Sequence, residues 1–567
     1  MHTLRPADVV ADEGDRRGAA TTAPGGSGTV LAALLVSQRC RRRDLAVAVL
    51  VLSAVAVVAF GSHVLHGSFY YDDWANSAKT HLAGGYGNAL RTFWELTGYR
   101  PLLAWYVPTL HEVLGSNIGL HLAWATAAAV AMSAGLYALL TEVGMARLHA
   151  VTISALVLVF PFSDATRFWA TSATAHLTAA LWMAGLVVAL RAFDAGRTRR
   201  SARRLHALSV CLYLASLLLY ELPATLMLGG GALYLLRAGW RRGLTRWAVD
   251  VAVIAPTLAY ILTTSTIDTA PGGAGRVEHA RLILDQGWRI MASAAWPFAT
   301  VSRGVVTVVA GLVLAVSAGL LRRLARGDPL RAVLARWLVF ASGGFVATWT
   351  AWAVFVPGHP YYSPGTQGVG NRVNVLAAIG IVVLLYSLIV IAVAVVGRAL
   401  GLGGSVAPLV AWAAALVVGA SYLAHVRTDA RAWDAAARAQ ERTLAVLEAK
   451  LPAPEPGSVI WTFGGALWQG PGIPIFASSW DLNGAVQLAY DDPTLRGYPA
   501  QPLTKFACGP DEISPVNAAG SPPSPYGKAY FVDVVSGQVD RLTDPEDCRA
   551  AAARFKPGPY ELPEVSP

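Results

Sequence analysis

The feature that most constrains this chain is the recurrence of apolar stretches close to the length that crosses a bilayer. A transmembrane helix needs about 20 predominantly apolar residues, and eleven stretches approach or reach that length, the third and the fifth being short. They are 45–61, 118–140, 150–161, 174–193, 206–220, 222–237, 249–266, 303–320, 337–356, 373–396 and 406–424. Only 14% of the 567 residues are charged, against roughly a quarter in soluble proteins. The sequence therefore predicts a mainly α-helical fold, a polytopic transmembrane bundle of about 11 spans.

Basic residues fall in short clusters between the apolar stretches, and this distribution predicts the orientation. A net charge of +10 could indicate a nucleic-acid-binding protein, but clusters of this kind mark the cytoplasmic loops of membrane proteins. They lie in 194–205, 238–248 and 321–336. We therefore expect the N-terminus inside and the C-terminal region outside, with the lipid bilayer as a partner and no nucleic acid.

Composition divides the chain into four parts. Residues 1–43 mix Gly, Ala, Thr, Asp and Arg and are expected to form a disordered cytoplasmic tail. Residues 44–424 form the transmembrane module, which has a long first outer loop at 62–117. An amphipathic helix and a Pro-rich linker are expected in 425–457. Strand-like runs within 458–567 predict a small mixed α/β extracytoplasmic domain.

Two of the four cysteines lie in this C-terminal domain. Cys508 and Cys548 are expected to form a disulfide if the domain lies outside, where the environment is oxidising. Cys40 belongs to the basic N-terminal segment and Cys211 to an apolar stretch.

The most unusual polar stretch, Phe69-Tyr-Tyr-Asp-Asp-Trp-Ala-Asn76, follows the first predicted span. Tyr and Trp favour the membrane interface, but two adjacent acids at this position need a specific explanation. In an extended chain the side chains of Asp72 and Asp73 point to opposite sides, so we expect one of them to face a reaction and favour Asp73. The alternative is that both are solvated, or that they cap a helix beginning near Trp74.

Other unusual polar residues gather on the same predicted outer side. Arg100 precedes Pro101 and either contacts a lipid phosphate or anchors the chain among headgroups. Arg372 follows a Gly-rich loop and runs against the charge rule, so it is either a phosphate ligand or a snorkelling side chain. Glu221 separates two apolar runs, where an acid is costly unless it is paired or solvated.

Several residues have a weaker claim to a role in binding. Candidates for substrate contact in the outer segments are Trp74, Glu95, His359, Tyr362 and Asn371. Asp164 and Arg167, spaced i, i+3, are expected to pair locally in a structural role. Four aromatic residues of the C-terminal domain can either stack on sugars or fill its core: Trp461, Trp468, Trp480 and Tyr490.

A long first outer loop with an Asp-Asp pair directly after the first span resembles the GT-C superfamily of integral-membrane glycosyltransferases. The segment Tyr99-Arg-Pro-Leu102 is similar to an Arg-Pro-Leu segment of several members, and a C-terminal extracytoplasmic domain also fits. The resemblance implies a GT-C-like bundle that uses a polyprenyl-phosphate sugar at the outer face of a bacterial cytoplasmic membrane. It further implies a first-loop Asp as the catalytic base, and suggests a second acidic residue near the place of Glu221.

The expected reaction is the inverting transfer of a sugar from polyprenyl phosphate to an envelope glycan, lipid or protein. A base must take the acceptor proton, and positive charge must stabilise the departing phosphate. Asp73, Asp72 and Glu221 are the candidates for the catalytic acids, and Arg100 and Arg372 for the phosphate. The carboxylate pair would also suit a divalent cation, Mg²⁺ or Mn²⁺, although no set of metal ligands is assigned.

Two other functions stay open. A transporter or flippase would place acids or broken helices in the middle of its spans, whereas a non-catalytic envelope-assembly protein would need no reaction centre. Convergence of Asp72, Asp73, Arg100 and Arg372 on one outer cavity would favour the enzyme.

Overall fold

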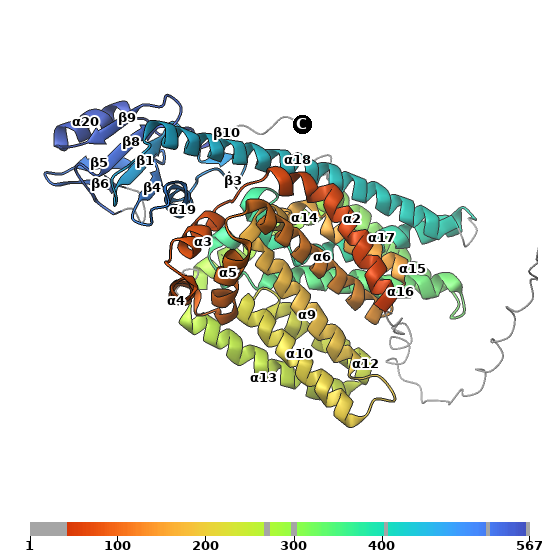
Figure 1. Cartoon of the computed structure of the whole chain (residues 1–567). Helices are drawn as coiled ribbons and strands as arrows, with labels where there is room; N and C mark the ends of the chain where they lie inside the picture. Colours follow the sequence, from red (N-terminus) through yellow and green to blue (C-terminus); the bar gives the residue numbers. More distant parts are fainter. Residues whose placement is uncertain (1–41, 266–272, 296–302, 402–405, 517–521, 563–567) are drawn as a thin grey trace, which may run out of the picture.

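The computed structural model describes residues 42–265, 273–295, 303–401, 406–516 and 522–562. Figure 1 shows a bundle of long helices, a smaller strand-containing domain beside it, and helix α18 running from one to the other. Apart from its last two residues, the N-terminal tail predicted at 1–43 lies outside the described residues.

Nine helices in these ranges are long and apolar enough to cross a membrane, judged by length and composition. They are α2 (Arg42–His66), α6 (Ile118–Glu142), α9 (Ala173–Arg191), α10 (Arg199–Leu219), α13 (Trp240–Thr264), α15 (Arg303–Arg323), α16 (Pro329–Ala353), α17 (Ala377–Ala399) and α18 (Val406–Lys450). Two shorter apolar segments are α7 (Arg147–Leu158) and the pair α11 (Ala224–Gly229) and α12 (Gly231–Ala238). Each predicted span coincides with one of these segments, and the mainly helical polytopic class is confirmed.

The fifth apolar run, 206–220, is short, but the helix that contains it is longer. Helix α10 begins at Arg199 and contains 21 residues. Its first two turns carry Arg199, Arg200, Arg203 and Arg204, so a search for apolar runs misses them although their backbone is helical.

The first outer loop, 62–117, folds into three helices. These are α3 (Asp72–His81), α4 (Tyr86–Thr97) and α5 (Pro101–Leu114), which lie between the bundle and the C-terminal domain in Figure 1. Pro101 occupies the first turn of α5, where a missing backbone N–H costs nothing. An amphipathic helix that the apolar pattern does not reveal, α14 (Gly273–Ala295), lies between α13 and α15.

Short helical turns connect the spans near the same end of the bundle. Between α7 and α9 they are η1 (Pro161–Ser163), α8 (Ala165–Phe168) and η2 (Ala170–Ser172), and between α16 and α17 they are η3 (Pro360–Tyr362) and η4 (Gly368–Asn374).

Helix α18 is continuous over 45 residues, whereas the sequence predicts a span at 406–424 and a separate amphipathic helix after it. At 1.5 Å per residue it is roughly 68 Å long, about twice the hydrocarbon thickness of a bilayer. Its second half is tied to the start of the first outer loop. His63 Nδ1 lies 2.8 Å from Asp434 Oδ1, and the Tyr70 hydroxyl donates a 2.8 Å hydrogen bond to the carbonyl of Trp433.

The C-terminal domain has the mixed α/β composition that was predicted. Its main sheet has the order β4-β1-β8-β9, in which β1 (Val459–Phe463) runs parallel to β4 (Arg496–Pro499) and β8 (Ala529–Asp533) and β9 (Val539–Leu542) is antiparallel to β8. Two small sheets contain β10 (Glu561–Leu562), β2 (Trp468–Gln469) and β3 (Ile473–Pro474), and β5 (Lys505–Cys508), β6 (Glu512–Val516) and β7 (Ser524–Pro525). The helices are α19 (Ser479–Tyr490) and α20 (Pro545–Arg554).

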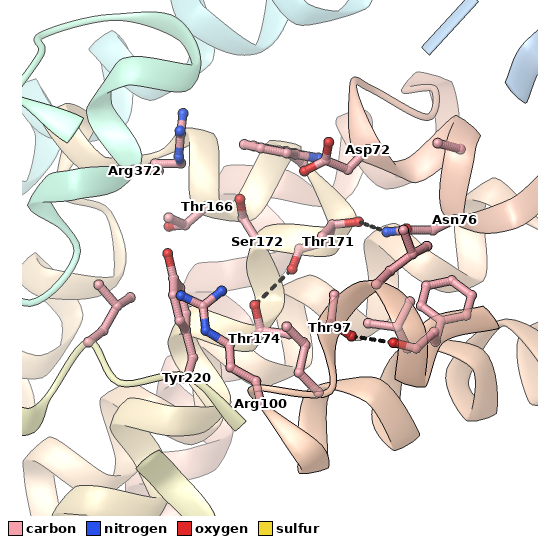
Figure 2. Close-up of a pocket in the computed structure, with 18 of the residues that line it drawn as sticks. Asp72, Asn76, Thr97, Arg100, Thr166, Thr171, Ser172, Thr174, Tyr220 and Arg372 are labelled. Carbon is pink, nitrogen blue, oxygen red and sulfur yellow. Dashed lines mark hydrogen bonds between the residues drawn. The ribbon is translucent and has the colours of Figure 1, made fainter. Parts of the chain in front are cut away.

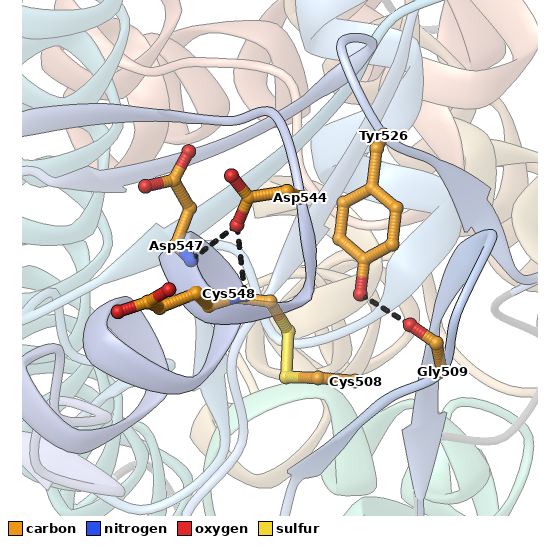
Figure 3. The surroundings of a disulfide bond; sticks show 7 residues. Cys508, Gly509, Tyr526, Asp544, Asp547 and Cys548 are labelled. Carbon is orange, nitrogen blue, oxygen red and sulfur yellow. Dashed lines mark hydrogen bonds between the residues drawn. A yellow bond between two sulfur atoms is a disulfide. The ribbon is translucent and has the colours of Figure 1, made fainter.

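A disulfide joins Cys508 on β5 to Cys548 on α20, with 5.8 Å between the two Cα atoms (Figure 3). Asp544 caps α20 by accepting hydrogen bonds from the backbone N–H groups of Glu546 and Asp547, at 2.8 and 2.9 Å. The disulfide therefore fixes the β5–β6 hairpin to a helix whose start is itself well defined.

Helices α16 and α17 approach until their backbones touch. A Cβ atom on Gly344 would lie 2.7 Å from the carbonyl oxygen of Gly380, and one on Gly380 would lie 2.5 Å from that of Gly344. Small residues allow this kind of close packing between transmembrane helices. The contact fixes both ends of the connection that carries η3 and η4.

We expect Gly344→Ala to lower the free energy of unfolding by about 1–3 kcal/mol, because the added methyl group overpacks this contact. A Cβ on Gly343, one residue earlier, meets no atom within 4 Å. Gly343→Ala is therefore the matched control, since both variants gain the same helix propensity. Thermal unfolding in lipid nanodiscs measures the difference, and equal stability of the two variants would contradict the close contact.

Candidate functional site

A cavity of about 520 Å³, here called the main cavity, lies where the first outer loop, the spans and the C-terminal domain meet. Its charged and polar lining includes Asp72, Asn76, Lys79, Arg100, Tyr220 and Arg372. Figure 2 shows these elements around one hollow, with Asp72 and Arg372 toward the top of the view and Arg100 and Tyr220 toward the bottom. Segments far apart in the sequence thus supply one site.

One face of α3 lines this cavity. Asp72, Asn76 and Lys79 are spaced by four and three residues, so they share a face of the helix. Asn76 Nδ2 donates a 3.2 Å hydrogen bond to the hydroxyl of Thr171 (Figure 2). The turn before α3 is sharp, since Tyr71 has a φ of 54°, which is unusual for a bulky residue.

Asp73, the residue that the sequence favoured as the base, lies on the other side of α3 and does not line the main cavity. It is 1% exposed. Its Oδ1 accepts hydrogen bonds from the backbone N–H and hydroxyl of Thr171, at 2.7 and 2.5 Å, and its Oδ2 accepts from the N–H groups of Ala170 and Tyr70. Burial raises the pKa of Asp73 to about 7, although the hydrogen bonds from Thr171 and Tyr70 oppose the rise. With both oxygens occupied, Asp73 anchors α3 to η2.

Asp72 is the acid that faces the main cavity. Burial raises the pKa of Asp72 above its ordinary value, whereas the charge of Arg372, a hydrogen bond from Trp480 and the charge of Lys79 oppose the rise. Two cations and a carboxylate therefore share one partly desolvated space.

Arg372 lies in η4, and its guanidinium is surrounded by aromatic rings. Its Nη1 donates a 2.7 Å hydrogen bond to the carbonyl of Val369. The guanidinium carbon lies 4.8 Å from the ring centre of Tyr361 and 5.4 Å from those of Trp169 and Tyr362. Aromatic faces attract a cation without neutralising it, so a positive charge is held at the cavity wall.

Arg100 is engaged differently, because Glu221 pairs with it. Arg100 Nε donates a 2.7 Å hydrogen bond to Glu221 Oε2, and its Nη2 donates to Oε1 of the same carboxylate. Glu221 does not line the main cavity, so its geometry suits positioning of Arg100 better than the catalytic role expected from the sequence. The guanidinium also lies 4.5 Å from the ring centre of Tyr220.

A second hollow of about 260 Å³, the apolar chamber, adjoins the main cavity. Both are lined by Arg100, Tyr220 and Tyr362. The apolar chamber continues between α13 and the end of α16, along side chains that include Leu258, Ile261, Leu262, Val354 and Phe355. The two hollows therefore meet at Arg100, Tyr220 and Tyr362, and the second has the more apolar wall.

The weaker substrate candidates are dispersed. Tyr362 lines both hollows and His359 lines the apolar chamber. Glu95 is exposed on α4 and lines neither. Trp74 is 9% exposed and packs on Phe69, with 5.5 Å between the ring centres, so it belongs to the core.

Asn371 is fully buried and structural. Its Nδ2 donates a 2.7 Å hydrogen bond to Asp164 Oδ1, and its Oδ1 accepts one from the N–H of Ala165. Arg167, expected to pair with Asp164, instead donates to the carbonyls of Ser163 and Val157. These groups connect η4, which carries Arg372, to the turn between α7 and α9.

The cation site suggested by the carboxylate pair is not formed by the described residues. Asp73 has both oxygens occupied, and Asp72 faces two cations. Within the described ranges, no three His, Cys, Asp or Glu residues gather in a way that could hold a metal ion. The donor set does not fit a resident cation, and positive charge at the site comes from side chains.

Sequence reasoning missed Lys79, Tyr220 and Trp169, all of which line the main cavity. A signal existed for Lys79, one of only five lysines in the chain, because it lies seven residues after Asp72 on a helix. Tyr220 and Trp169 carry no comparable signal, since aromatic residues at a membrane interface are common.

Replacing Asp73 with asparagine should destabilise the protein by about 1–3 kcal/mol, because the amide nitrogen cannot accept the hydrogen bonds that now reach the carboxylate. Asp72→Asn is the matched control, since Asp72 does not bridge α3 to η2, and it should change stability less. Thermal unfolding of both purified variants in nanodiscs makes the comparison. A larger loss for Asp72→Asn would reverse the two assignments.

Comparison with known proteins adds a distant structural likeness. No family model and no curated protein matches the chain. Among solved structures, the chain is similar to the crystal structure of ArnT from Cupriavidus metallidurans in the apo state, at 12% sequence identity and a TM-score of 0.40. The match covers 79% of this chain and 85% of that chain. A similarity at this identity and score supports no particular activity.

Proposed function

We propose that this protein is a GT-C-type membrane glycosyltransferase that moves a sugar from a polyprenyl-phosphate donor to an acceptor hydroxyl. The observation that carries the proposal is the main cavity, where Asp72 faces Arg372 and Lys79 beside an apolar chamber. A base, a phosphate-binding cation and a place for a lipid are the parts that this reaction requires.

Asp72 acts as the base in this proposal. Its carboxylate takes the proton of the acceptor hydroxyl while the hydroxyl oxygen attacks the anomeric carbon. The bond from that carbon to the phosphate oxygen breaks, and its electron pair leaves with the polyprenyl phosphate. Attack opposite to the leaving group inverts the anomeric configuration.

Arg372 and Lys79 stabilise the phosphate as negative charge develops on it. Arg372 is the better placed of the two arginines, because its guanidinium faces aromatic rings, whereas Glu221 engages two nitrogens of Arg100. Arg100 retains a positioning role at the passage between the two hollows, and Glu221 holds it there.

The apolar chamber receives the first isoprenyl units of the donor. Its wall includes side chains of α13 and of the segment that follows α16, and both helices are long and apolar enough to cross a membrane. A lipid entering between these helices would bring its phosphate to Arg100 and Tyr220, which line both hollows.

The site faces the outside of a bacterial cytoplasmic membrane in this proposal, and the acceptor is an envelope glycan, lipid or protein. The Arg-rich start of α10 and Tyr220, which follows its last residue, lie at opposite ends of the helix. Since basic clusters stay inside, the cavity belongs outside. The disulfide in the C-terminal domain agrees with that side.

A transporter, a flippase or an assembly protein would not need this arrangement. Convergence of four residues on one outer cavity would favour the enzyme. Three of them line the main cavity, namely Asp72, Arg100 and Arg372. Asp73 does not, but its hydrogen bonds hold the helix that carries Asp72. This convergence favours the enzyme.

Replacing Asp72 with asparagine is expected to slow sugar transfer by about 10²–10⁴-fold, the usual contribution of a general base. The assay uses purified protein in lipid, labelled polyprenyl-phosphate sugars and an envelope extract as acceptor. Asp511→Asn, an exposed acid of the C-terminal domain, is the control. Undiminished transfer by Asp72→Asn would remove Asp72 as the base, and no transfer by the wild type would contradict the enzyme.

The pH dependence gives a separate prediction. Asp72 acts only when ionised and its pKa lies above the ordinary 3.8, so transfer should fall as the pH drops through that raised pKa. The charges that act on Asp72 are those of Arg372 and Lys79, and the charge of Asp72 acts in turn on Asp73, Asp481 and Tyr71. Lys79→Met removes a favourable charge and should move the loss of activity to higher pH, whereas Lys505→Met, on β5, should not.

A further inference from the structure

The C-terminal domain contributes one side chain, Trp480, to the main cavity. We propose that this side chain completes the reaction centre. Trp480 of α19 provides a flat aromatic surface for a sugar ring beside the carboxylate of Asp72. This inference rests on the proposed glycosyltransferase function and assigns to the C-terminal domain the recognition of a glycosyl group.

Trp480 differs from the other tryptophan residues of its domain in where it points. It is 43% exposed and lines the main cavity, whereas Trp461 is 1% exposed in the core of the domain. Its ring centre lies 5.2 Å from that of Tyr71 at an interplanar angle of 83°. An edge-to-face contact of this kind orients the indole and leaves its surface open.

The start of α19 is built rigidly, so the direction of Trp480 is defined. Ser478 and Asp481 form a capping box. Asp481 is fully buried, and its carboxylate accepts hydrogen bonds from the backbone N–H groups of Ala477 and Leu482, at 2.9 and 2.7 Å. Trp480 lies between Ser478 and Asp481, the two residues of the capping box.

Helix α19 packs directly on α3. A Cβ atom on Gly484 would lie 2.5 Å from the carbonyl carbon of Trp74, so glycine is required for the two helices to touch. The ring of Trp74 also packs on that of Phe476, with 6.2 Å between their centres. The contact places Trp480 beside the helix that begins at Asp72.

The same domain also touches the segment that carries Arg372. The backbone N–H of Val369 donates a 2.8 Å hydrogen bond to the carbonyl of Gly472. Gly368, with a φ of 57°, lies so close that a Cβ there would clash with that carbonyl oxygen. One domain therefore holds both the helix of the proposed base and the loop of the proposed phosphate ligand.

The chemistry of this wall suits a sugar ring. The C–H face of a sugar packs on an aromatic ring, while its hydroxyl groups need polar partners such as Asp72, Asn76 and Lys79, which line the same cavity. The glycosyl group can belong to the donor or to the acceptor, and the kinetic measurement below distinguishes these two sources.

The test compares Trp480→Ala with Trp480→Phe in the full chain, in the transfer assay with labelled polyprenyl-phosphate sugars and envelope extract. Trp480→Ala should raise KM about tenfold, the loss expected for one aromatic contact. A rise in KM for the labelled donor alone indicates that Trp480 contacts the sugar of the donor. A rise in KM for the envelope extract alone indicates that Trp480 contacts the acceptor. Leu503→Ala, at a 76% exposed site of the same domain, is the control.

Trp480→Phe separates stacking from positioning. Phenylalanine retains an aromatic face, so KM should return most of the way to the wild-type value. It lacks the indole N–H whose proximity lowers the pKa of Asp72, so the loss of activity at low pH should begin at a higher pH than in the wild type. Unchanged KM and pH profile in both variants, with Asp72→Asn inactive, would overturn the inference and leave the proposed function standing.

Docking of the domain has a readout that needs no substrate. Gly484→Val should separate α19 from α3 and increase hydrogen exchange in the peptide 72–81, with a loss of transfer. Gly87→Ala, where a Cβ meets nothing within 4 Å, should leave both unchanged. Unaltered exchange in Gly484→Val would overturn the docking, and no transfer by the wild type would overturn the proposed function together with the sugar assignment.

Discussion

The carboxylate of Asp73 accepts hydrogen bonds from Thr171, Ala170 and Tyr70 at a point that water does not reach. These donors belong to two segments about a hundred residues apart, and the carboxylate is what joins them. Because Asp73 lies in the first turn of α3, fixing it also fixes the face of the helix that carries Asp72, Asn76 and Lys79. A buried acid of this kind is costly unless it is fully hydrogen-bonded, and here the bonds define the geometry of the cavity.

The two arginines near the cavity differ in their surroundings, since Glu221 pairs with Arg100 whereas aromatic rings surround Arg372. Glu221 binds Arg100 through two nitrogens, which keeps a cation at the passage between the hollows and limits what else it can bind. Arg372 is held by rings and one carbonyl, so its charge is oriented without being cancelled. In the proposed function, a phosphate arriving from the membrane would meet the paired arginine first and the aromatic-bound arginine second.

The spans and the mixed C-terminal domain could be predicted, because each depends on hydrophobic length or on composition along the chain. Which of the two acids lines the main cavity could not. An extended chain at the two acids is what favoured Asp73 from the sequence, whereas α3 begins at Asp72 and places the two acids on different faces of a helix. Trp480 was also ambiguous, since its role depends on the contact of Gly484 with Trp74, which joins residues about 400 positions apart. Lys79 was within reach, because a helical spacing from Asp72 would have identified it.

The continuity of α18 fixes the rotation of the C-terminal domain relative to the helical bundle. A helix without a break transmits rotation as well as distance, since each residue turns the chain by about 100°. One residue added or removed between the membrane and the C-terminal domain would therefore swing α19 around the helix axis and carry Trp480 away from Asp72. The spacing along this helix sets an angle, and its length in residues is as much a part of the site as the side chains that line it.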